Sequence, residues 1–212
     1  MKTSVIIPVK TFQKSKTRLQ LSKDKTIELC RVLLEEVVKT VSESGLIDKI
    51  IVVTNEEQIS DIIERYNCEK ILDIYEKSVN DAVGLAESFL IKNEFTHSIV
   101  LPLDVPFFYS EDLKKLLDFS DKKSVVIVPS RHFDGTNALL RTPIDSMRPR
   151  YDEGSYSFQI ESAREFNVKI SVGLIYRLML DIDNTKDLEF VIKHNIKPEL
   201  CDKIKKIISS YS

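Results

Sequence analysis

The sequence predicts an α/β fold with a mostly parallel central sheet and helices on both faces. Three observations lead to this prediction. Short apolar segments alternate along the chain with segments of helical period. The apolar segments are continuous and rich in β-branched residues, as in strands buried on both faces. No tract rich in Gly, Pro or Ser marks a second unit, so we expect one domain over residues 1–212.

Two strands and two helices are expected in the first third of the chain. Val5–Val9 is an apolar run that predicts the first buried strand, and a lysine-rich loop follows it. A helix is expected over Lys23–Ser44, where Gly45 is a natural stop. Lys49–Thr54 predicts a second strand and Glu57–Tyr66 a second helix. The long helix keeps its apolar residues at helical spacing, at Ile27, Cys30, Leu34, Val37, Val38 and Val41.

The same alternation continues through the rest of the chain. A strand at Lys70–Ile74, a helix over Asn80–Lys92 and a strand at His97–Leu101 precede a helix over Ser110–Phe119. Ser110 is expected to cap that helix, because acidic residues follow it in the first turn. The remaining expected elements are strands at Ser124–Pro129, Ala138–Arg141, Lys169–Val172 and Leu178–Ile182, and helices at Ser157–Phe166, Thr185–His194 and Pro198–Ser209.

Composition limits the partners of this chain. Of 212 residues, 42% are hydrophobic, which is enough for a sizeable core. The 31 Lys and Arg nearly balance the 33 Asp and Glu, so charge gives no bias toward nucleic acid or an anionic membrane. The apolar run before Pro8 is too short for a signal peptide or an anchor. We therefore expect a soluble, cytoplasmic protein that binds neither nucleic acid nor membrane.

The three cysteines are Cys30, Cys68 and Cys201. They are odd in number and far apart, which fits neither a disulfide framework nor a zinc site. We interpret them as buried or inert thiols in a reducing compartment.

The segment Ile99–Pro106 holds an isolated acid at the end of an expected strand. Asp104 lies between Pro102 and Pro106 with no basic residue beside it. Ligands in open α/β folds bind at the carboxyl edge of the sheet, so Asp104 is a candidate metal ligand. The alternative is an aspartate that caps a turn between two prolines.

A basic loop follows the first expected strand. In Val9–Leu19, the side chains of Lys10, Lys16 and Arg18 are candidates for binding phosphates. The loop has no glycine, which excludes a P-loop and the GxGxxG turn of a dinucleotide-dependent reductase. The alternative is a solvated basic loop.

A pair of acids follows another apolar run, in Leu180–Asn184. Alternation along a strand places Asp181 and Asp183 on one face, where either acid can join Asp104 in an oxygen-ligand shell for Mg²⁺. Alternatively, Asp183 or Asn184 caps the next helix.

Two polar turns predict an anion site. Thr136 and Asn137 precede an apolar segment and are expected to face a cleft, although a plain hairpin turn is the alternative. Further along, two arginines and a small-residue turn precede a helix and suit a phosphate or carboxylate; the residues are Arg148, Arg150, Gly154 and Ser155. An exposed basic loop is the alternative reading.

These segments together resemble the 2-phospho-L-lactate guanylyltransferase family, which also covers phosphoenolpyruvate guanylyltransferases. The matching motifs, in order, are IIPVK, KTRL, SVNDAV, LPLDVP, PSRHFDGTNALL, EGSYSF and LDIDNTKDL. The resemblance implies a nucleotide-diphospho-sugar transferase fold of the glycosyltransferase-A-like type. It also implies the Mg²⁺-dependent reaction of GTP with 2-phospho-L-lactate to lactyl-2-diphospho-5'-guanosine and pyrophosphate, in coenzyme F-420 biosynthesis.

The resemblance also implies roles for single residues. Asp104 and Asp183 would hold the metal, with Asp181 as the alternative to Asp183. Lys10, Lys16 and Arg18 would meet the triphosphate and act in catalysis. The nucleotide would lie against Pro8, Val9, Lys10, Asn80 and Ala82, and the phosphorylated acid against Thr136, Asn137, Arg150, Gly154 and Ser155.

Three departures from the family pattern bear on the acceptor. Residues 151–155 read Tyr-Asp-Glu-Gly-Ser in place of Phe-Gly-Pro-Gly-Ser, which places Asp152 and Glu153 near an anionic substrate. Ser78 and Val79 replace glycine and leucine, and the last acidic motif has Asn-Thr for Thr-Pro. The acceptor stays open among 2-phospho-L-lactate, phosphoenolpyruvate and 3-phospho-D-glycerate.

Other readings also stay open at this point. A related nucleotidyltransferase would use CTP or ATP, and a non-catalytic nucleotide-binding protein would use the same scaffold. The oligomeric state is open as well. A homodimer through the helix at Ser110–Leu117 and the C-terminal helices is one alternative.

Overall fold

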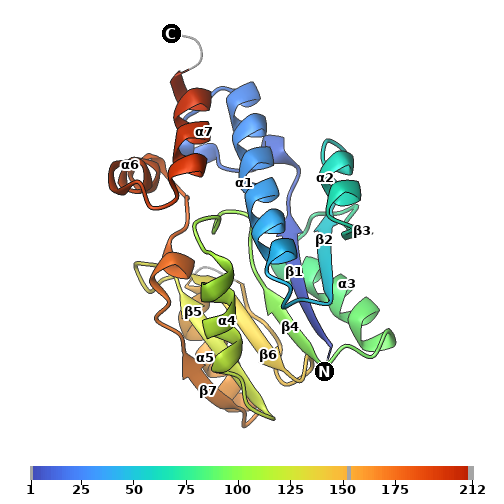
Figure 1. Ribbon diagram of the computed structural model, residues 1–212. Helices are drawn as coiled ribbons and strands as arrows, with labels where there is room; N and C mark the ends of the chain where they lie inside the picture. Colours follow the sequence, from blue (N-terminus) through green and yellow to red (C-terminus); the bar gives the residue numbers. More distant parts are fainter. Residues whose placement is uncertain (1, 152–153, 210–212) are drawn as a thin grey trace.

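The computed structural model describes residues 2–151 and 154–209, which form a seven-stranded sheet between two layers of helices (Figure 1). The strand order across the sheet is β3-β2-β1-β4-β6-β5-β7. The strands are β1 (Thr3–Val9), β2 (Lys49–Thr54), β3 (Glu69–Leu72), β4 (His97–Val100), β5 (Ser124–Pro129), β6 (Thr136–Thr142) and β7 (Lys169–Val172).

The sheet is mostly parallel, as predicted. Four neighbouring pairs are parallel: β3 with β2, β2 with β1, β1 with β4, and β5 with β7. Strand β6 is inserted antiparallel between β4 and β5. The carboxyl ends of β1, β2, β3, β4 and β5 therefore meet at one edge, and β6 starts at that edge.

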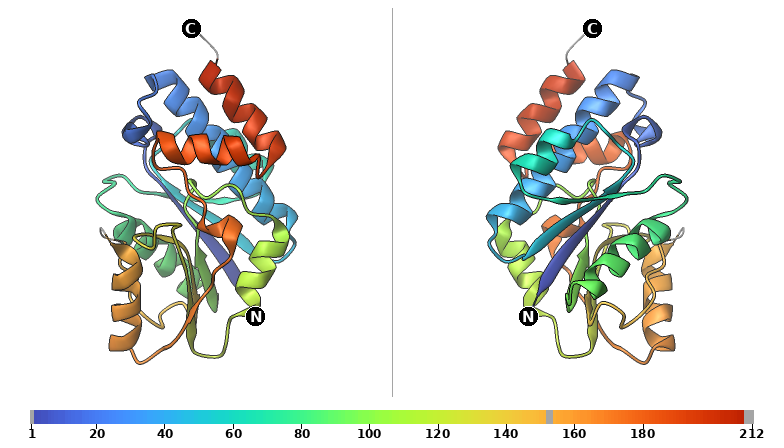
Figure 2. Two further views of the ribbon diagram at one scale, coloured as in Figure 1. Left: turned by 90° about the vertical axis from the view of Figure 1, so that its left-hand side faces the viewer. Right: turned by 90° about the vertical axis from the view of Figure 1, so that its right-hand side faces the viewer.

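Helices cover both faces of the sheet (Figure 2). Helices α3 (Val79–Lys92) and α5 (Ser155–Glu165) cover one face. The helices on the other face are α1 (Lys23–Glu43), α2 (Ser60–Arg65), α4 (Ser110–Asp118), α6 (Thr185–His194) and α7 (Pro198–Ser209). None of the helices in the described ranges combines the length and apolar content needed to cross a bilayer.

Each face of the sheet has its own apolar core. Under α3 and α5, Ile6, Val53 and Leu139 pack with Ala86 and Leu90. On the opposite face, alternate residues of the same strands pack against the long helix and its neighbours; they include Val5, Ile7, Val52, Ile99 and Leu140. This alternation explains why the strands read as continuous apolar runs.

The strand predicted at Leu178–Ile182 is wrong. The chain forms a short 3-10 helix at Tyr176–Met179 and then an irregular extended segment. Every second residue of this segment is apolar and buried, namely Leu178, Leu180 and Ile182, which explains the strand-like pattern. They belong to the apolar core on the α1 face of the sheet, where the 3-10 helix lies against β5 and β6, and both β4 and β5 already pair on both sides.

One predicted helix start and one predicted helix cap are also wrong. Helix α2 begins at Ser60 and not at Glu57, because the Glu56 carboxylate accepts the N–H groups of Glu57 and Gln58 at 3.0 Å and holds a turn there. Ser110 is the first residue of α4 and not its cap. The bounds of β2, β5, β7, α6 and α7 agree with the predictions, and the other elements differ by a few residues at one or both ends.

The cysteines are free thiols, with Cys30 and Cys201 buried and Cys68 partly buried. Burial raises the pKa of Cys30 and of Cys68 to about 11. The expectation of inert thiols is consistent with these positions.

We expect the folded protein to react slowly with a thiol-specific disulfide reagent at pH 8. At a pKa of about 11, only roughly one Cys68 thiol in a thousand is the reactive thiolate. The labelling rate should rise about tenfold per pH unit up to pH 10. Protein unfolded in urea should react rapidly at all three cysteines, and equally fast labelling of folded protein at pH 8 would contradict the prediction.

Lys197, between α6 and α7, is a buried ammonium that joins distant parts of the chain. Its Nζ lies 2.8 Å from Glu36 Oε1 and donates to Thr40 Oγ1 at 2.9 Å. It also donates to the carbonyls of Pro106 and Phe108, at 3.3 and 2.9 Å. Burial lowers the pKa of Lys197, although Glu36 opposes that shift. The segment after β4 is thus tied to α1 and to the start of α7.

Lys197→Met should lower the free energy of unfolding by about 3 kcal/mol, because it leaves the buried Glu36 carboxylate without its cation. Urea denaturation followed by circular dichroism measures the change. Lys203→Met, at an exposed position of α7, is the control and should stay within about 0.5 kcal/mol of the wild type.

Candidate active site

The ammonium of Lys16 lies between two carboxylates at the carboxyl edge of the sheet. Its Nζ is 2.7 Å from Asp104 Oδ2 and 3.2 Å from Asp183 Oδ1. The Lys16 side chain is 8% exposed, so these charges interact with little screening by solvent. Burial acts to lower the pKa of Lys16, but the two carboxylates outweigh burial and raise it.

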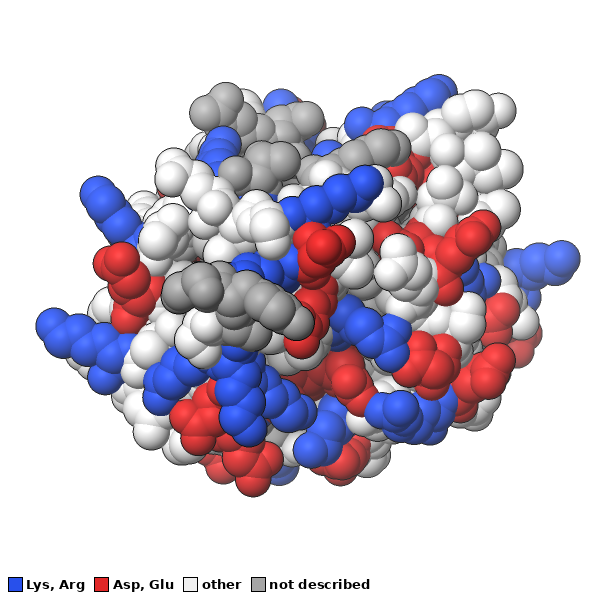
Figure 3. Space-filling view, turned by 90° about the horizontal axis from the view of Figure 1, so that it is seen from above, with Lys and Arg blue, Asp and Glu red and all other residues white. Residues whose placement is uncertain are grey.

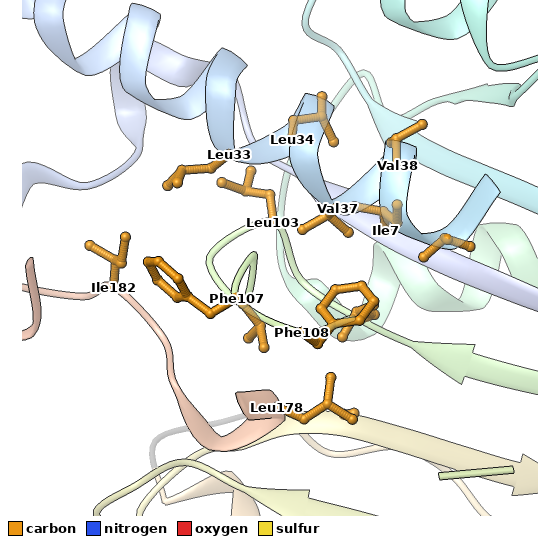
Figure 4. Packing of buried hydrophobic residues seen from close by; sticks show 14 of the residues in the cluster. Ile7, Leu33, Leu34, Val37, Val38, Leu103, Phe107, Phe108, Leu178 and Ile182 are labelled. Carbon is orange, nitrogen blue, oxygen red and sulfur yellow. The ribbon is translucent and has the colours of Figure 1, made fainter. Parts of the chain in front are cut away.

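The core fixes both acid-bearing segments. Leu103 and Val105, on either side of Asp104, are buried, as is Ile182 beside Asp183. Figure 4 shows Leu103 beneath α1 and Ile182 directed toward Phe107. The Ile182 N–H donates to the Asp104 carbonyl at 3.0 Å, which joins the two segments directly.

Two acids, the buried Glu56 and the partly buried Glu76, anchor the loop that carries Lys16. Glu56 accepts the N–H of Phe12 at 2.9 Å, and the Phe12 ring is fully buried. Glu76 accepts from the backbone N–H of Thr11 and from its Oγ1 at 2.6 Å. Glu56 and Glu76 therefore hold the start of the loop. At its turn, Lys16 takes the left-handed conformation that glycine adopts most easily, with φ +54°.

Asp181, in the irregular segment, lies close enough to Asp104 and Asp183 to feel their charges. Asn137 Nδ2 donates to its Oδ1 at 3.2 Å. The pairing of β5 and β6 shifts register beside Asn137, because Val128 pairs with Ala138 and the next residue pairs with Thr136. Such a bulge redirects a side chain. Burial and the negative charge of Asp104 raise the pKa of Asp181 to about 6.

A cavity of about 290 Å³ opens beside these charges. Lys10, Lys16, Asp104, Thr136 and Tyr151 contribute to its wall. We call it the central cavity; Pro8, Ser15, Val79, Val100, Pro102 and Leu103 complete its lining. The cavity thus brings together residues that follow β1 and β4 with the start of β6.

A narrower space of about 30 Å³ adjoins the central cavity, and the two share Pro8, Lys10 and Val79. We call it the side slot. Its other lining residues are Val9, Val53, Asp73, Glu76, Ser78 and Ala82. Four of the five residues predicted to bind the nucleotide therefore lie together: Pro8, Val9, Lys10 and Ala82.

The structure brings together Thr136 and Ser155, two of the residues predicted to meet the acceptor. Ser155 Oγ donates to Thr136 Oγ1 at 3.1 Å, and both residues are buried. Gly154, with φ +76°, precedes α5, and among the described residues no side chain caps the first turn of that helix. The positive dipole end of α5 suits an anion.

Other predicted residues lie elsewhere. Asn80 Oδ1 accepts the N–H of Tyr151 at 2.8 Å, so Asn80 joins α3 to the turn before α5 and does not line the side slot. The Arg150 guanidinium lies over the Phe158 ring, and Arg18 is exposed. Within the described part of the chain, neither arginine lines the cavities. Asp152 and Glu153 lie outside the described residues.

Asp187 supports the site and was not predicted. Its Oδ2 accepts the N–H groups of Asp183 and Asn184, at 3.2 and 3.1 Å, and its Oδ1 lies 2.9 Å from Arg131 Nη2. Arg131 also stacks on Phe190. Asn184 caps α6, as one of the two predicted alternatives has it. An acid three residues after a cap is the sequence signal that would have indicated this role.

The donor set at the site fits a divalent cation that shares its shell with phosphate and water. Oxygens of Asp104 and Asp183, from two different segments, converge on one cationic group. Among the described residues, no three His, Cys, Asp or Glu side chains form a complete metal site. Mg²⁺ commonly binds through one or two carboxylates and substrate phosphates.

Figure 3 views the molecule from the side on which these strands end. Positive and negative side chains are interspersed over this face, without a broad patch of one sign. Selectivity for an anionic ligand must therefore come from the few cations inside the cavities, Lys10 and Lys16.

Comparison with known families decides the assignment. The model of the family described as "Guanylyl transferase CofC like" matches residues 3–209. The chain belongs to this family. A 2-phospho-L-lactate guanylyltransferase of Methanothermobacter thermautotrophicus is 31% identical to this chain, and the match covers 92% of this chain and 86% of the relative. The chain is also similar to relatives with other names.

A phosphoenolpyruvate guanylyltransferase of Conexibacter woesei is 30% identical over 89% of this chain and 86% of its own. A 3-phospho-D-glycerate guanylyltransferase of Colwellia psychrerythraea is 31% identical, with 90% and 91% covered. A Desulfovibrio desulfuricans protein described as a nucleotide-diphospho-sugar transferase has a similar structure, with a TM-score of 0.72, 14% identity, and 98% and 99% of the two chains covered. The expected nucleotide-diphospho-sugar transferase fold is thereby confirmed.

Arg131→Met should lower kcat for guanylyl transfer about tenfold or more, because Asp187 then loses its cation and holds Asp183 less firmly. Steady-state kinetics should show a smaller change in the nucleotide KM. Arg164→Met, on the exposed side of α5, is the control. An unchanged kcat for Arg131→Met would show that this ion pair does not position the acid.

Proposed function

We propose that this protein transfers GMP from GTP to 2-phospho-L-lactate and releases pyrophosphate, with Mg²⁺, in the synthesis of coenzyme F-420. The observation that carries the proposal is the position of Lys16, Asp104 and Asp183 between the nucleotide-side residues of β1 and the acceptor-side hairpin. The membership of the chain in the CofC-like family supports the same reaction class.

The chemistry joins two phosphates. An oxygen of the acceptor phosphate attacks the α-phosphorus of GTP, the bond from that phosphorus to the β-phosphate oxygen breaks, and pyrophosphate leaves with the electron pair. The acceptor needs no general base, because a phosphate monoester with a second pKa of about 6 is already ionised at neutral pH. Catalysis then depends on positioning and on neutralisation of charge.

The residues of this chain divide these tasks. Lys10 and Lys16 reach the central cavity and would neutralise the triphosphate as pyrophosphate leaves. Asp104 and Asp183 would hold Mg²⁺, which when bound offsets the negative charge of the phosphates. Lys16 would exchange its carboxylate partners for phosphate oxygens when the nucleotide and the cation enter.

The acceptor would lie at the start of α5. Thr136 and Ser155 present hydroxyl groups there, and the first turn of α5, which no described side chain caps, would offer backbone N–H groups. These groups suit a small molecule with one phosphate and one carboxylate. The three candidate acceptors share that chemistry, so the choice among them depends on a hydroxyl or a double bond.

Incubation with GTP, Mg²⁺ and each candidate acceptor, with product masses measured, tests the proposal. We expect lactyl-2-diphospho-5'-guanosine as the main product and no turnover after chelation of the metal. A main product from phosphoenolpyruvate or 3-phospho-D-glycerate would change the acceptor. Turnover with CTP or ATP in preference to GTP would contradict the guanylyl donor.

Asp104→Asn should reduce pyrophosphate release by about 10²-fold or more, because the site loses one of its two converging charges. The folded structure should persist, since the flanking residues remain buried. Asp202→Asn, an exposed residue of α7, is the matched control and should keep wild-type turnover. Near-native turnover of Asp104→Asn with an intact circular dichroism spectrum would refute the role of Asp104.

A further inference from the structure

The side slot contains a buried carboxylate that the reaction above does not use. Asp73 directly follows β3, at the same edge of the sheet as Asp104, and is only 8% exposed. Its N–H donates to the Thr54 carbonyl at 3.2 Å, and its Oδ1 accepts the N–H of Glu76 at 3.0 Å. These two hydrogen bonds hold Asp73 at the start of the loop that joins β3 to α3.

The second carboxylate oxygen of Asp73 has no donor among the described side chains. The neighbouring wall is apolar, formed by Val53, Val79 and Ala82. Asp73 is 8% exposed and lines the slot, so a ligand that enters the slot and supplies N–H donors to this carboxylate would form charge-assisted hydrogen bonds there.

We propose that Asp73 determines the base specificity of the enzyme by accepting hydrogen bonds from the N1–H and 2-amino groups of guanine. This inference rests on the proposed use of GTP. Guanine presents two adjacent donors on that edge, whereas adenine presents the N1 acceptor, which a carboxylate repels. The side slot, at about 30 Å³, admits the edge of a base and not the whole purine.

The shared lining residues connect base and phosphates. Pro8, Lys10 and Val79 border both the side slot and the central cavity. A purine whose edge meets Asp73 would therefore rest on Pro8 and Val79, and its phosphates would extend toward Lys10 and Lys16. One turn after β1 thus serves both ends of the nucleotide.

The substitution Asp73→Asn tests the proposal with little change of shape. The amide oxygen can keep the bond from the Glu76 N–H, which leaves the amide nitrogen at the position of the free carboxylate oxygen. That donor opposes the amino group of guanine and matches the 2-oxo group of xanthine. GTP binding should weaken about 10- to 100-fold, and XTP should become the better ligand.

Isothermal titration with GTP and XTP measures the two dissociation constants without an acceptor, and kcat/KM for pyrophosphate release gives a second readout. Asp118→Asn, at an exposed position of α4, is the matched control and should keep the wild-type preference for GTP. An unchanged ratio of GTP to XTP affinity in folded Asp73→Asn would overturn the assignment.

Wild-type protein gives an independent test, should the variant fail to fold. ITP lacks the 2-amino group and should bind about tenfold or more weakly than GTP. Equal affinity for ITP and GTP would overturn the role of Asp73 while the proposed reaction stands. If the wild type neither binds GTP nor releases pyrophosphate with any of the three acceptors, the proposed function and this inference both fail.

Discussion

The pairing of the Lys16 ammonium with Asp104 and Asp183 determines where three remote segments of the chain meet. A cation with little solvent access is tolerable only when carboxylates surround it. The loop after β1, the segment after β4 and the segment before α6 must therefore converge. Burial of the apolar residues beside both acids secures that convergence, so the packing of the core also positions the charged groups of the site.

Acidic side chains hold the loops of this site by their backbone. Glu56 and Glu76 accept N–H groups from the loop that bears Lys16, and Asp187 accepts those of Asp183 and Asn184. A carboxylate accepting backbone donors fixes a loop without regular structure. The cationic and acidic groups are therefore preorganised before any substrate arrives, which reduces the cost of ordering them.

The sequence predicted the fold well where a local signal was sufficient. The bounds of β2, β5 and α6 agree with the predicted ranges, because apolar runs and helical periods specify them directly. Leu178–Ile182 has the alternation of a strand, but hydrogen bonding depends on whether a free sheet edge is available, which no local pattern reveals. Asp104 was recognisable by its isolation after a strand. Asp73 has the same position after β3, but its slot depends on residues from three other segments, and so the sequence did not single it out.

The reversed direction of β6 separates the two halves of the site. The residues proposed to meet the nucleotide, Pro8, Val9 and Lys10, lie at the end of a parallel strand, whereas Thr136 and Asn137 begin the antiparallel strand β6. The hairpin turn between β5 and β6 takes no part in the pairing among β3, β2, β1 and β4. On the proposed assignment of Thr136 to the acceptor, substitutions in this hairpin would change acceptor preference without moving the parallel strands that lead to Lys10 and Asp104.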